Sequence, residues 1–278
     1  MSYPASEFIL QSRGSLSERA FAFLRATASR AEFDPGLTGG DLRDEIFRVY
    51  GTYNDPIVLL LDNLQNRYGG LTYQSGFFDA VVTFSPVCEP EDPAEDLEVL
   101  YAVETGSPAG ASIKPTGEVE VGVDGEGVIE FPSLDTLIEC DSMFGTARKL
   151  PHFTQRSIDN SGLRRVTDRL NREFARVSEA SGQHCSWFEN SSGMVFVNGS
   201  WAALELGMSP TVSLWSRLAY GTPASRRLWH NNSFKSGMAA GGNQKLFHFF
   251  GGYQDYLRTS SAAFIQYDCQ SAPATRRG

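Results

Sequence analysis

Long apolar runs are absent from this sequence. The most apolar run, Ile57 to Leu61, stops at Asp62 after five residues, whereas a membrane-spanning helix needs roughly 18 or more. The first ten residues, MSYPASEFIL, contain no basic segment leading into an apolar one, so we expect no secretory signal. The expectation is a cytoplasmic protein that does not span a membrane.

Cysteine and histidine are scarce, with four of each in 278 residues. The cysteines stand far apart, which fits reduced thiols better than a disulfide framework or a zinc knuckle. The histidines lack H-x-x-x-H spacing, so no metal site is predicted. The residues are Cys88, Cys140, Cys185 and Cys269, and His152, His184, His230 and His248.

A nucleophile stands next to a base only at His184-Cys185. We expect this pair to begin a strand, where neighbouring side chains point to opposite faces. The pattern therefore favours a buried thiol beside a surface imidazole over a catalytic pair. The glycine pairs lack both the Walker lysine and the G-x-G-x-x-G order, so no nucleotide cofactor is predicted, and we do not expect an enzyme.

Positive charge is almost missing from the middle of the chain. The net charge of −9 argues against a nucleic-acid-binding protein. Between residues 85 and 145, fifteen acids face Lys114 alone and give −14, while residues 146–278 carry +8. This segregation indicates either two units that attract each other or an acidic surface for a basic partner.

The most acidic segment is the loop predicted at residues 86–98. Burying so many unpaired carboxylates would be prohibitive, so we expect the loop to be exposed. Acid–base catalysis uses a carboxyl in an apolar setting, whereas these acids cluster with proline. We therefore interpret them as partner-binding rather than catalytic residues. They are Glu89, Glu91, Asp92, Glu95, Asp96 and Glu98.

Three helices are predicted before residue 70, beginning near Ser15, Asp41 and Asp55. Ser15 and Glu18 have the spacing of a capping box, and apolar residues follow at helical spacing. Asp55 is expected to be the N-cap of the third helix, with Pro56 at its first helical position.

Short strands separated by turns are predicted between residues 77 and 131, and together they indicate an antiparallel meander. A tight hairpin turn is expected at residues 124–127. Ser133 then caps a closing helix. The predicted strands cover residues 77–84, 97–105, 118–123 and 128–131, and the expected core residues of the helix are Leu134, Leu137, Ile138 and Phe144.

The second half mixes helix and strand as well. Residues 161–182 predict an amphipathic helix that ends at Gly182, and residues 184–189 and 194–198 predict two strands joined by a turn. The class is therefore α+β. We expect one α+β domain over residues 1–145 and an α+β extension or second domain over residues 146–278.

Segments that begin at Ser200, Pro210 and Pro223 each predict a short helix bearing a tryptophan. The aromatic residues of this half can line a sugar or nucleotide pocket, but such side chains more often fill a core. The arginines of the amphipathic segment can contact nucleic acid, although an acidic neighbour explains them as well. They are Arg164, Arg165, Arg169, Arg172 and Arg176.

Short motifs between residues 37 and 145 occur in a characteristic order. They are Asp55-Pro56 opening a helix, Arg67-Tyr68-Gly69-Gly70-Leu71 ending it, Tyr101-Ala102-Val103 in a strand, Gly125 in a hairpin, and Phe131-Pro132-Ser133-Leu134 leading into Ile138-Glu139. In these features the chain resembles the SUKH superfamily, the Smi/Knr-like α+β proteins.

The resemblance implies a non-enzymatic fold, common in bacteria as immunity proteins that bind and block a cognate toxin, often a nuclease or deaminase. An acidic surface would steer a basic toxin toward such a protein. Two alternatives stay open: a non-enzymatic adaptor or scaffold of the same fold, and a small-molecule-binding protein or enzyme that uses the aromatic C-terminal half. The expected partner is a basic protein, with no membrane or nucleic acid and no cofactor.

Overall fold

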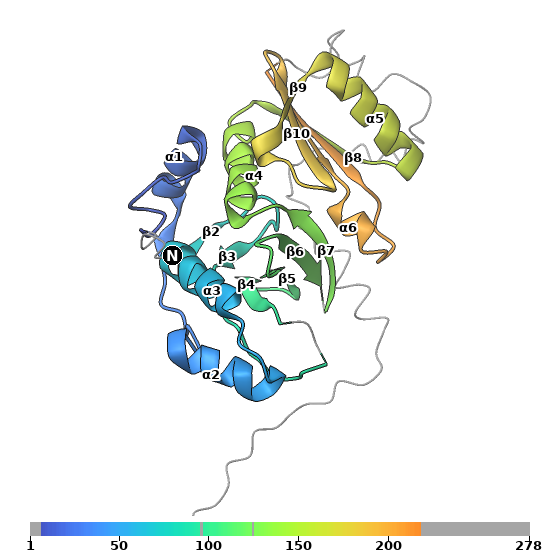
Figure 1. Cartoon of the computed structure of the whole chain (residues 1–278). Helices are drawn as coiled ribbons and strands as arrows, with labels where there is room; N and C mark the ends of the chain where they lie inside the picture. Colours follow the sequence, from blue (N-terminus) through green and yellow to red (C-terminus); the bar gives the residue numbers. More distant parts are fainter. Residues whose placement is uncertain (1–6, 95–96, 124, 218–278) are drawn as a thin grey trace, which may run out of the picture. The chain divides into compact units, whose positions relative to one another are not determined.

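The computed structural model describes residues 7–94, 97–123 and 125–217. These residues belong to one compact unit with two antiparallel β-sheets and several helices (Figure 1). The predicted α+β class is therefore confirmed. Position 145, where we expect a domain boundary, lies inside helix α4 (Leu134–Ala147) of this unit.

The larger sheet is a seven-stranded meander in which each strand pairs with the next one along the chain. The predicted hairpin is confirmed, but its turn is shorter than predicted, because Glu126 already belongs to β7 and pairs with Val123. Gly125 in that turn has a φ of 87°, a left-handed value that glycine adopts without strain. The strands are β1 (Ser29–Arg30), β2 (Leu71–Gln74), β3 (Val81–Thr83), β4 (Val99–Thr105), β5 (Ala109–Ile113), β6 (Val119–Val123) and β7 (Glu126–Phe131).

Part of this sheet differs from the sequence prediction. Strands β1, β2 and β5 have no predicted counterpart, and the strand predicted at 77–84 is wrong at its start. Phe77 and Phe78 instead lie in the turn before β3, with both rings buried. Strand β5 contains alanine and glycine, which have low β-propensity, so its sequence gives little sign of a strand.

The first three helices occur as predicted, but two of their N-caps are shifted. Ser17 rather than Ser15 caps the first helix, and Ser15 donates a hydrogen bond to Asp135 instead. Asn54 rather than Asp55 caps the third. The helices are α1 (Glu18–Thr27), α2 (Gly39–Tyr50) and α3 (Asp55–Tyr68).

The smaller sheet has five antiparallel strands in the order β8-β12-β11-β10-β9. The two strands predicted around residues 184–198 are confirmed. The short helix expected from Pro210 is wrong, because this segment pairs with both β8 and β11 and forms β12. The segment from Pro223 lies outside the described residues. The elements are β8 (His152–Ser157), β9 (Ala175–Val177), β10 (Cys185–Asn190), β11 (Gly193–Asn198), α6 (Ser200–Ala203) and β12 (Thr211–Ser216).

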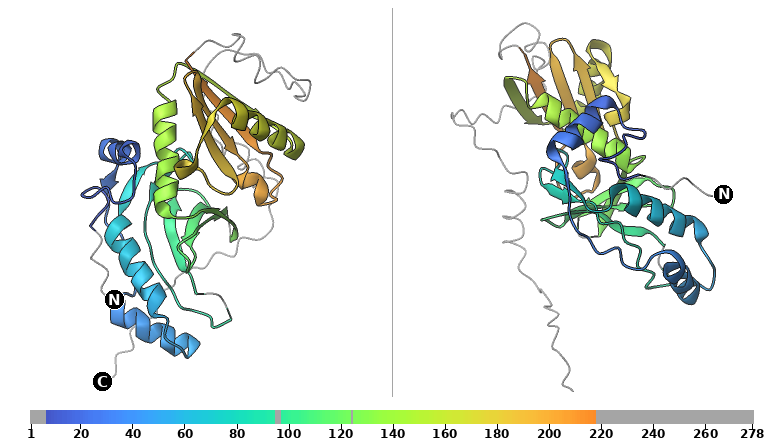
Figure 2. Two further views of the ribbon diagram at one scale, coloured as in Figure 1. Left: turned by 45° about the horizontal axis from the view of Figure 1, so that its top comes forward. Right: turned by 90° about the vertical axis from the view of Figure 1, so that its left-hand side faces the viewer.

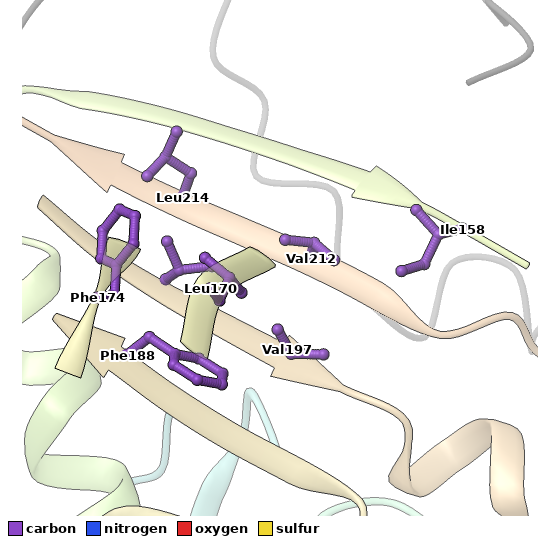
Figure 3. Close-up of a cluster of buried hydrophobic side chains, with 8 residues drawn as sticks. Ile158, Leu170, Phe174, Phe188, Val197, Val212 and Leu214 are labelled. Carbon is purple, nitrogen blue, oxygen red and sulfur yellow. The ribbon is translucent and has the colours of Figure 1, made fainter. Parts of the chain in front are cut away.

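The amphipathic helix α5 (Asn160–Glu173) lies across one face of this sheet (Figure 2). It is shorter than predicted, since the chain turns extended at Phe174 so that β9 can pair with β10. Its apolar side joins a buried cluster with the strands (Figure 3). The cluster contains Ile158, Leu170, Phe174, Phe188, Val195, Val197, Val212 and Leu214, with Leu163 and Val166 packed against it.

Helix α4 is buried on nearly every side, from Leu137 through Phe144. Ser133 caps it as predicted by accepting the N–H of Thr136. The predicted apolar core residues are all buried. The same stretch also buries Glu139, Cys140, Asp141 and Ser142, and buried polar groups of this kind must find hydrogen-bond partners.

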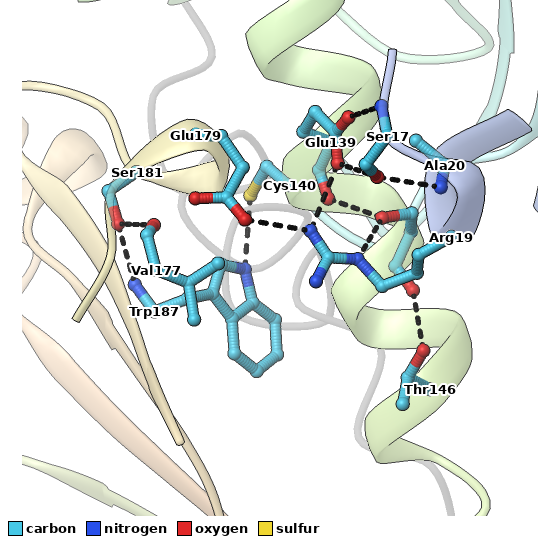
Figure 4. A network of polar contacts seen from close by, with 11 residues as sticks. Ser17, Arg19, Ala20, Glu139, Cys140, Thr146, Val177, Glu179, Ser181 and Trp187 are labelled. Atoms are coloured by element: carbon cyan, nitrogen blue, oxygen red, sulfur yellow. Dashed lines mark hydrogen bonds and ion pairs between the residues drawn. The ribbon is translucent and has the colours of Figure 1, made fainter. Parts of the chain in front are cut away.

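Glu139 finds its partners at the start of α1 (Figure 4). Its carboxylate accepts the backbone N–H of Ser17 at 2.5 Å and the Ser17 hydroxyl at 2.8 Å. Arg19 donates to the same carboxylate at 3.0 Å and to the hydroxyl of Ser142, also at 3.0 Å. The guanidinium also lies 3.7 Å from Glu179, so one arginine connects α1, α4 and the short helix η1 (Ser178–Ala180).

Asp141 faces the turn between β2 and β3. Its carboxylate accepts hydrogen bonds from the hydroxyls of Tyr73 and Ser75 and from the backbone N–H groups of Gly76 and Phe77, all at 2.8 to 2.9 Å. Burial raises the pKa of Asp141 to about 6, although these donors work in the opposite direction.

Contacts between α4 and the smaller sheet are aromatic. The indole N–H of Trp187 in β10 donates to the Cys140 sulfur at 3.3 Å. Phe144 packs edge-to-face against Trp187, Phe196 and Trp215, with ring centroids 4.8 to 5.9 Å apart. Such pairs prefer this geometry, and they anchor β10, β11 and β12 to the helix.

Glu130 of β7 makes a second connection to this sheet. Its carboxylate accepts the N–H groups of His184 and Cys185 at 3.1 and 3.0 Å. Gly182 passes so close that an added Cβ would lie 2.1 Å from the carboxylate. The start of β10 is therefore fixed against the last strand of the larger sheet.

Replacing Glu139 by alanine should lower the free energy of unfolding by about 3 kcal/mol, because it leaves the α1 N-terminus and Arg19 without their buried acceptor. Urea unfolding followed by circular dichroism measures this change. Glu45→Ala is the matched control, since it removes only an exposed pair with Arg48, and it should change stability little. Equal losses in the two variants would contradict the structural role of Glu139.

Asp141→Asn should change how stability depends on pH. Because the pKa of Asp141 is raised to about 6 in the folded chain, the stabilisation by its protonated form is complete below about pH 4 and is lost as pH rises through 6. Asparagine cannot titrate, so the wild type should lose roughly 3 kcal/mol relative to the variant between pH 4 and 7. Parallel pH profiles from urea unfolding would show that the group does not titrate there.

Candidate functional site

A cavity of about 920 Å³ opens where the loop before β4 meets strands β4 to β7. On the strands, partly exposed residues alternate with buried ones: Ser112 lies between Ala111 and Ile113, and Glu120 between Val119 and Val121. One face of this part of the sheet therefore packs on the core, while the other face is polar and open. Tyr50 of α2 also lines the cavity.

The cavity is acidic. Seven carboxylates line it, and none of the described lining residues is a lysine or an arginine. Carboxylates gathered in a concave site with low-dielectric walls reinforce one another's potential and attract cations. The acids are Glu89, Glu91, Asp92, Glu98, Glu104, Glu120 and Glu126.

The predicted partner-binding residues lie partly at this cavity. Glu89, Glu91 and Asp92 are exposed and line it, as expected for a solvated loop. Glu98 also lines it, but only 17% of its side chain is exposed. Glu95 and Asp96 lie outside the described residues.

Glu98 is bound to the one basic residue of the acidic segment. The ammonium of Lys114 pairs with Glu98 and lies 3.0 Å from Glu120. Burial works to lower the pKa of Lys114, but the hydrogen bonds to both carboxylates outweigh it and the pKa is raised. This pair of carboxylates therefore already holds a cation, and the remaining acids of the cavity are those exposed toward a partner.

Sequence reasoning missed the strand acids Glu104, Glu120 and Glu126. Each sits in a strand that also holds valines, and the alternation of Glu120 with Val119 and Val121 is visible in the sequence. That alternation assigns Glu120 to the open face. It does not show that this face meets the acidic loop, because the meeting depends on how the loop folds back.

Part of the cavity lining has no side chains. Gly110, Gly122 and Gly127 are cross-strand neighbours on β5, β6 and β7, since Gly110 pairs with Gly122 and Gly122 with Gly127. An added Cβ on Gly122 would lie 2.3 Å from the carbonyl oxygen of Glu126, and one on Gly110 would lie 2.9 Å from that of Val103. Glycine inside strands often marks close approach of another backbone or a ligand.

Other predicted features carry no site in the described part of the chain. Cys185 is buried beside the exposed His184, as expected. Trp187, Trp201 and Trp215 are buried, with at most 6% of each exposed, so they fill the core. Trp229 lies outside the described residues. Within the described ranges, no group of three or more His, Cys, Asp or Glu residues could hold a metal ion, and no helix is long and apolar enough to span a membrane.

Comparison of the chain with models of protein families, with curated proteins and with solved structures found no match. The geometry of the acidic cavity is therefore the basis for the functional argument.

Gly122→Ala should destabilise the chain by about 2 kcal/mol, because its Cβ would force β6 and β7 apart at the cavity. Thermal and urea unfolding measure the loss. Gly106→Ala, in the neighbouring turn, is the matched control, since nothing lies within 4 Å of its added Cβ. A Gly122 variant as stable as the Gly106 variant would mean that the strands do not pack as described.

Proposed function

We propose that this chain is a protein-binding protein whose acidic cavity takes up a basic segment of its partner. The observation that carries the proposal is the convergence of seven carboxylates on one cavity with no lysine or arginine among its described lining residues. Such a site raises the association rate of a basic partner and disfavours acidic ones.

Together with the SUKH resemblance, an acidic cavity favours one kind of partner. This is a basic, nucleic-acid-processing toxin, whose positive active-site surface the chain would cover in the cytoplasm. Inhibition by occlusion needs no catalytic group, and the five cavity acids other than Glu98 and Glu120 suit it because they are exposed. We therefore favour an immunity protein over a non-enzymatic adaptor or scaffold. In the adaptor alternative, the acidic loop would only keep the protein in solution.

Within residues 146–217, the buried tryptophans weigh against the third hypothesis, a pocket for small molecules in the aromatic half. The Trp187 ring packs at a tilt against Phe196 and Trp215, with ring centroids 4.7 and 5.5 Å apart. Rings packed in this way present their faces to one another, and not to a ligand.

The proposal is tested with a fluorescein-labelled nona-arginine peptide as the basic probe. The triple change Glu91→Ser, Asp92→Ser and Glu104→Ser should weaken binding by roughly an order of magnitude, since it removes nearly half of the carboxylates lining the cavity. Fluorescence anisotropy at low salt measures the affinity, and stopped-flow mixing should place most of the loss in the association rate.

The matched control is Glu7→Ser, Glu32→Ser and Glu189→Ser, which removes the same charge from exposed positions outside the cavity. It should bind the peptide almost as tightly as the wild type. If both triple variants lose affinity equally, the peptide responds to net charge alone, and the cavity is not the site.

A further inference from the structure

A second charged surface, which is positive, lies on helix α5. Arg164, Arg165 and Arg172 are exposed on its solvent side, where Asp168 is the acid among them. Arg169 is held by Glu173 at 2.9 Å, and Arg176 follows, exposed, in β9. We call Arg164, Arg165, Arg172 and Arg176 the arginine stripe.

The stripe is presented on a rigid support. The apolar side of α5 is fixed in the buried cluster of the smaller sheet (Figure 3). Asp159 caps the helix by accepting the N–H of Gly162 at 2.5 Å, and this bond lowers the pKa of Asp159. All four stripe arginines are exposed, and Arg165 also interacts electrostatically with Asp159 at the start of the helix.

We propose that the acidic cavity of one copy of this chain binds the arginine stripe of a second copy. The proposal rests on the proposed function, since it uses the same cavity as a site for cations. Charge complementarity supports it, because the described residues form both an acidic cavity and an arginine-rich surface on one polypeptide. Arginine suits this contact, since its guanidinium forms paired hydrogen bonds with carboxylates.

The dimensions of the two surfaces agree. Arg165 and Arg172 are seven residues apart on a helix, which places them about 10 Å apart along its axis. The exposed cavity acids Glu104 and Glu126 stand on β4 and β7, and four neighbouring strands span about 14 Å. One helix face can therefore reach carboxylates on both strands at once.

The contact is heterologous, since a cavity on the larger sheet meets a helix on the smaller sheet of the next copy. A heterologous contact leaves one free cavity and one free stripe at the ends of every assembly, so it continues into larger oligomers unless it closes into a ring. The contact also covers the cavity, so self-association competes with a basic partner. The cavity stays occupied until a partner that binds more tightly displaces the second copy.

The test uses full-length protein in sedimentation velocity at about 50 and about 500 mM NaCl. The wild type should associate with increasing concentration at low salt, and high salt should raise the apparent dissociation constant more than roughly tenfold. Two variants with neutral replacements separate the surfaces: Arg164→Gln, Arg165→Gln and Arg172→Gln remove the stripe, while Glu91→Ser, Asp92→Ser and Glu104→Ser remove the cavity acids.

Each variant alone should stay monomeric at low salt. An equimolar mixture should form one-to-one dimers and nothing larger, because the stripe variant still offers a cavity and the cavity variant still offers a stripe. This recovery also shows that both variants are folded.

A wild type that stays monomeric at low salt, a mixture as inert as its components, or association that neither variant affects would overturn the proposal. A stripe that binds a labelled oligonucleotide while the protein remains monomeric would assign that surface to nucleic acid instead. Failure here is distinct from failure of the proposed function, because nona-arginine binding by the monomer is measured separately.

Discussion

The burial of helix α4 is the constraint on which the rest of the structure depends. Between Leu137 and Phe144 this helix is buried, so its polar side chains there cannot turn to water and must find hydrogen-bond partners within the protein. Glu139 holds the N-terminus of α1, Asp141 holds the turn after β2, and Cys140 accepts the indole N–H of Trp187. Three consecutive residues thus fix three distant parts of the chain against one helix.

Much of the fold could be predicted where the signal is local. Ser133 capping α4 and the hairpin between β6 and β7 depend on residues within a few positions of each other. The end of α5 could not be predicted in this way, because Phe174 leaves the helical conformation where β9 pairs with β10. The same holds for Pro210, where pairing with β8 and β11 overrides the helical pattern.

The candidate site could be predicted in part. The exposure of the loop acids could be predicted, because so many carboxylates in one short segment cannot be buried without partners. Each strand acid can be recognised in the sequence, but that these acids lie beside the loop depends on the tertiary structure and cannot be predicted from local sequence. Lys114 shows the limit most clearly, because the single cation of the acidic segment neutralises Glu98, which the sequence marked as a free contact residue.

The cavity combines two kinds of position: the paired glycines Gly110, Gly122 and Gly127 of the sheet, where a side chain does not fit, and loop residues that can vary. A side chain at Gly122 would meet the carbonyl of Glu126, so replacing this glycine lowers the stability of the sheet. The loop residues Glu89, Glu91 and Asp92 stand in solvent and can be exchanged without disturbing the sheet. Partner preference can therefore change through substitutions in this loop alone, while the strand glycines that form the base of the cavity stay the same.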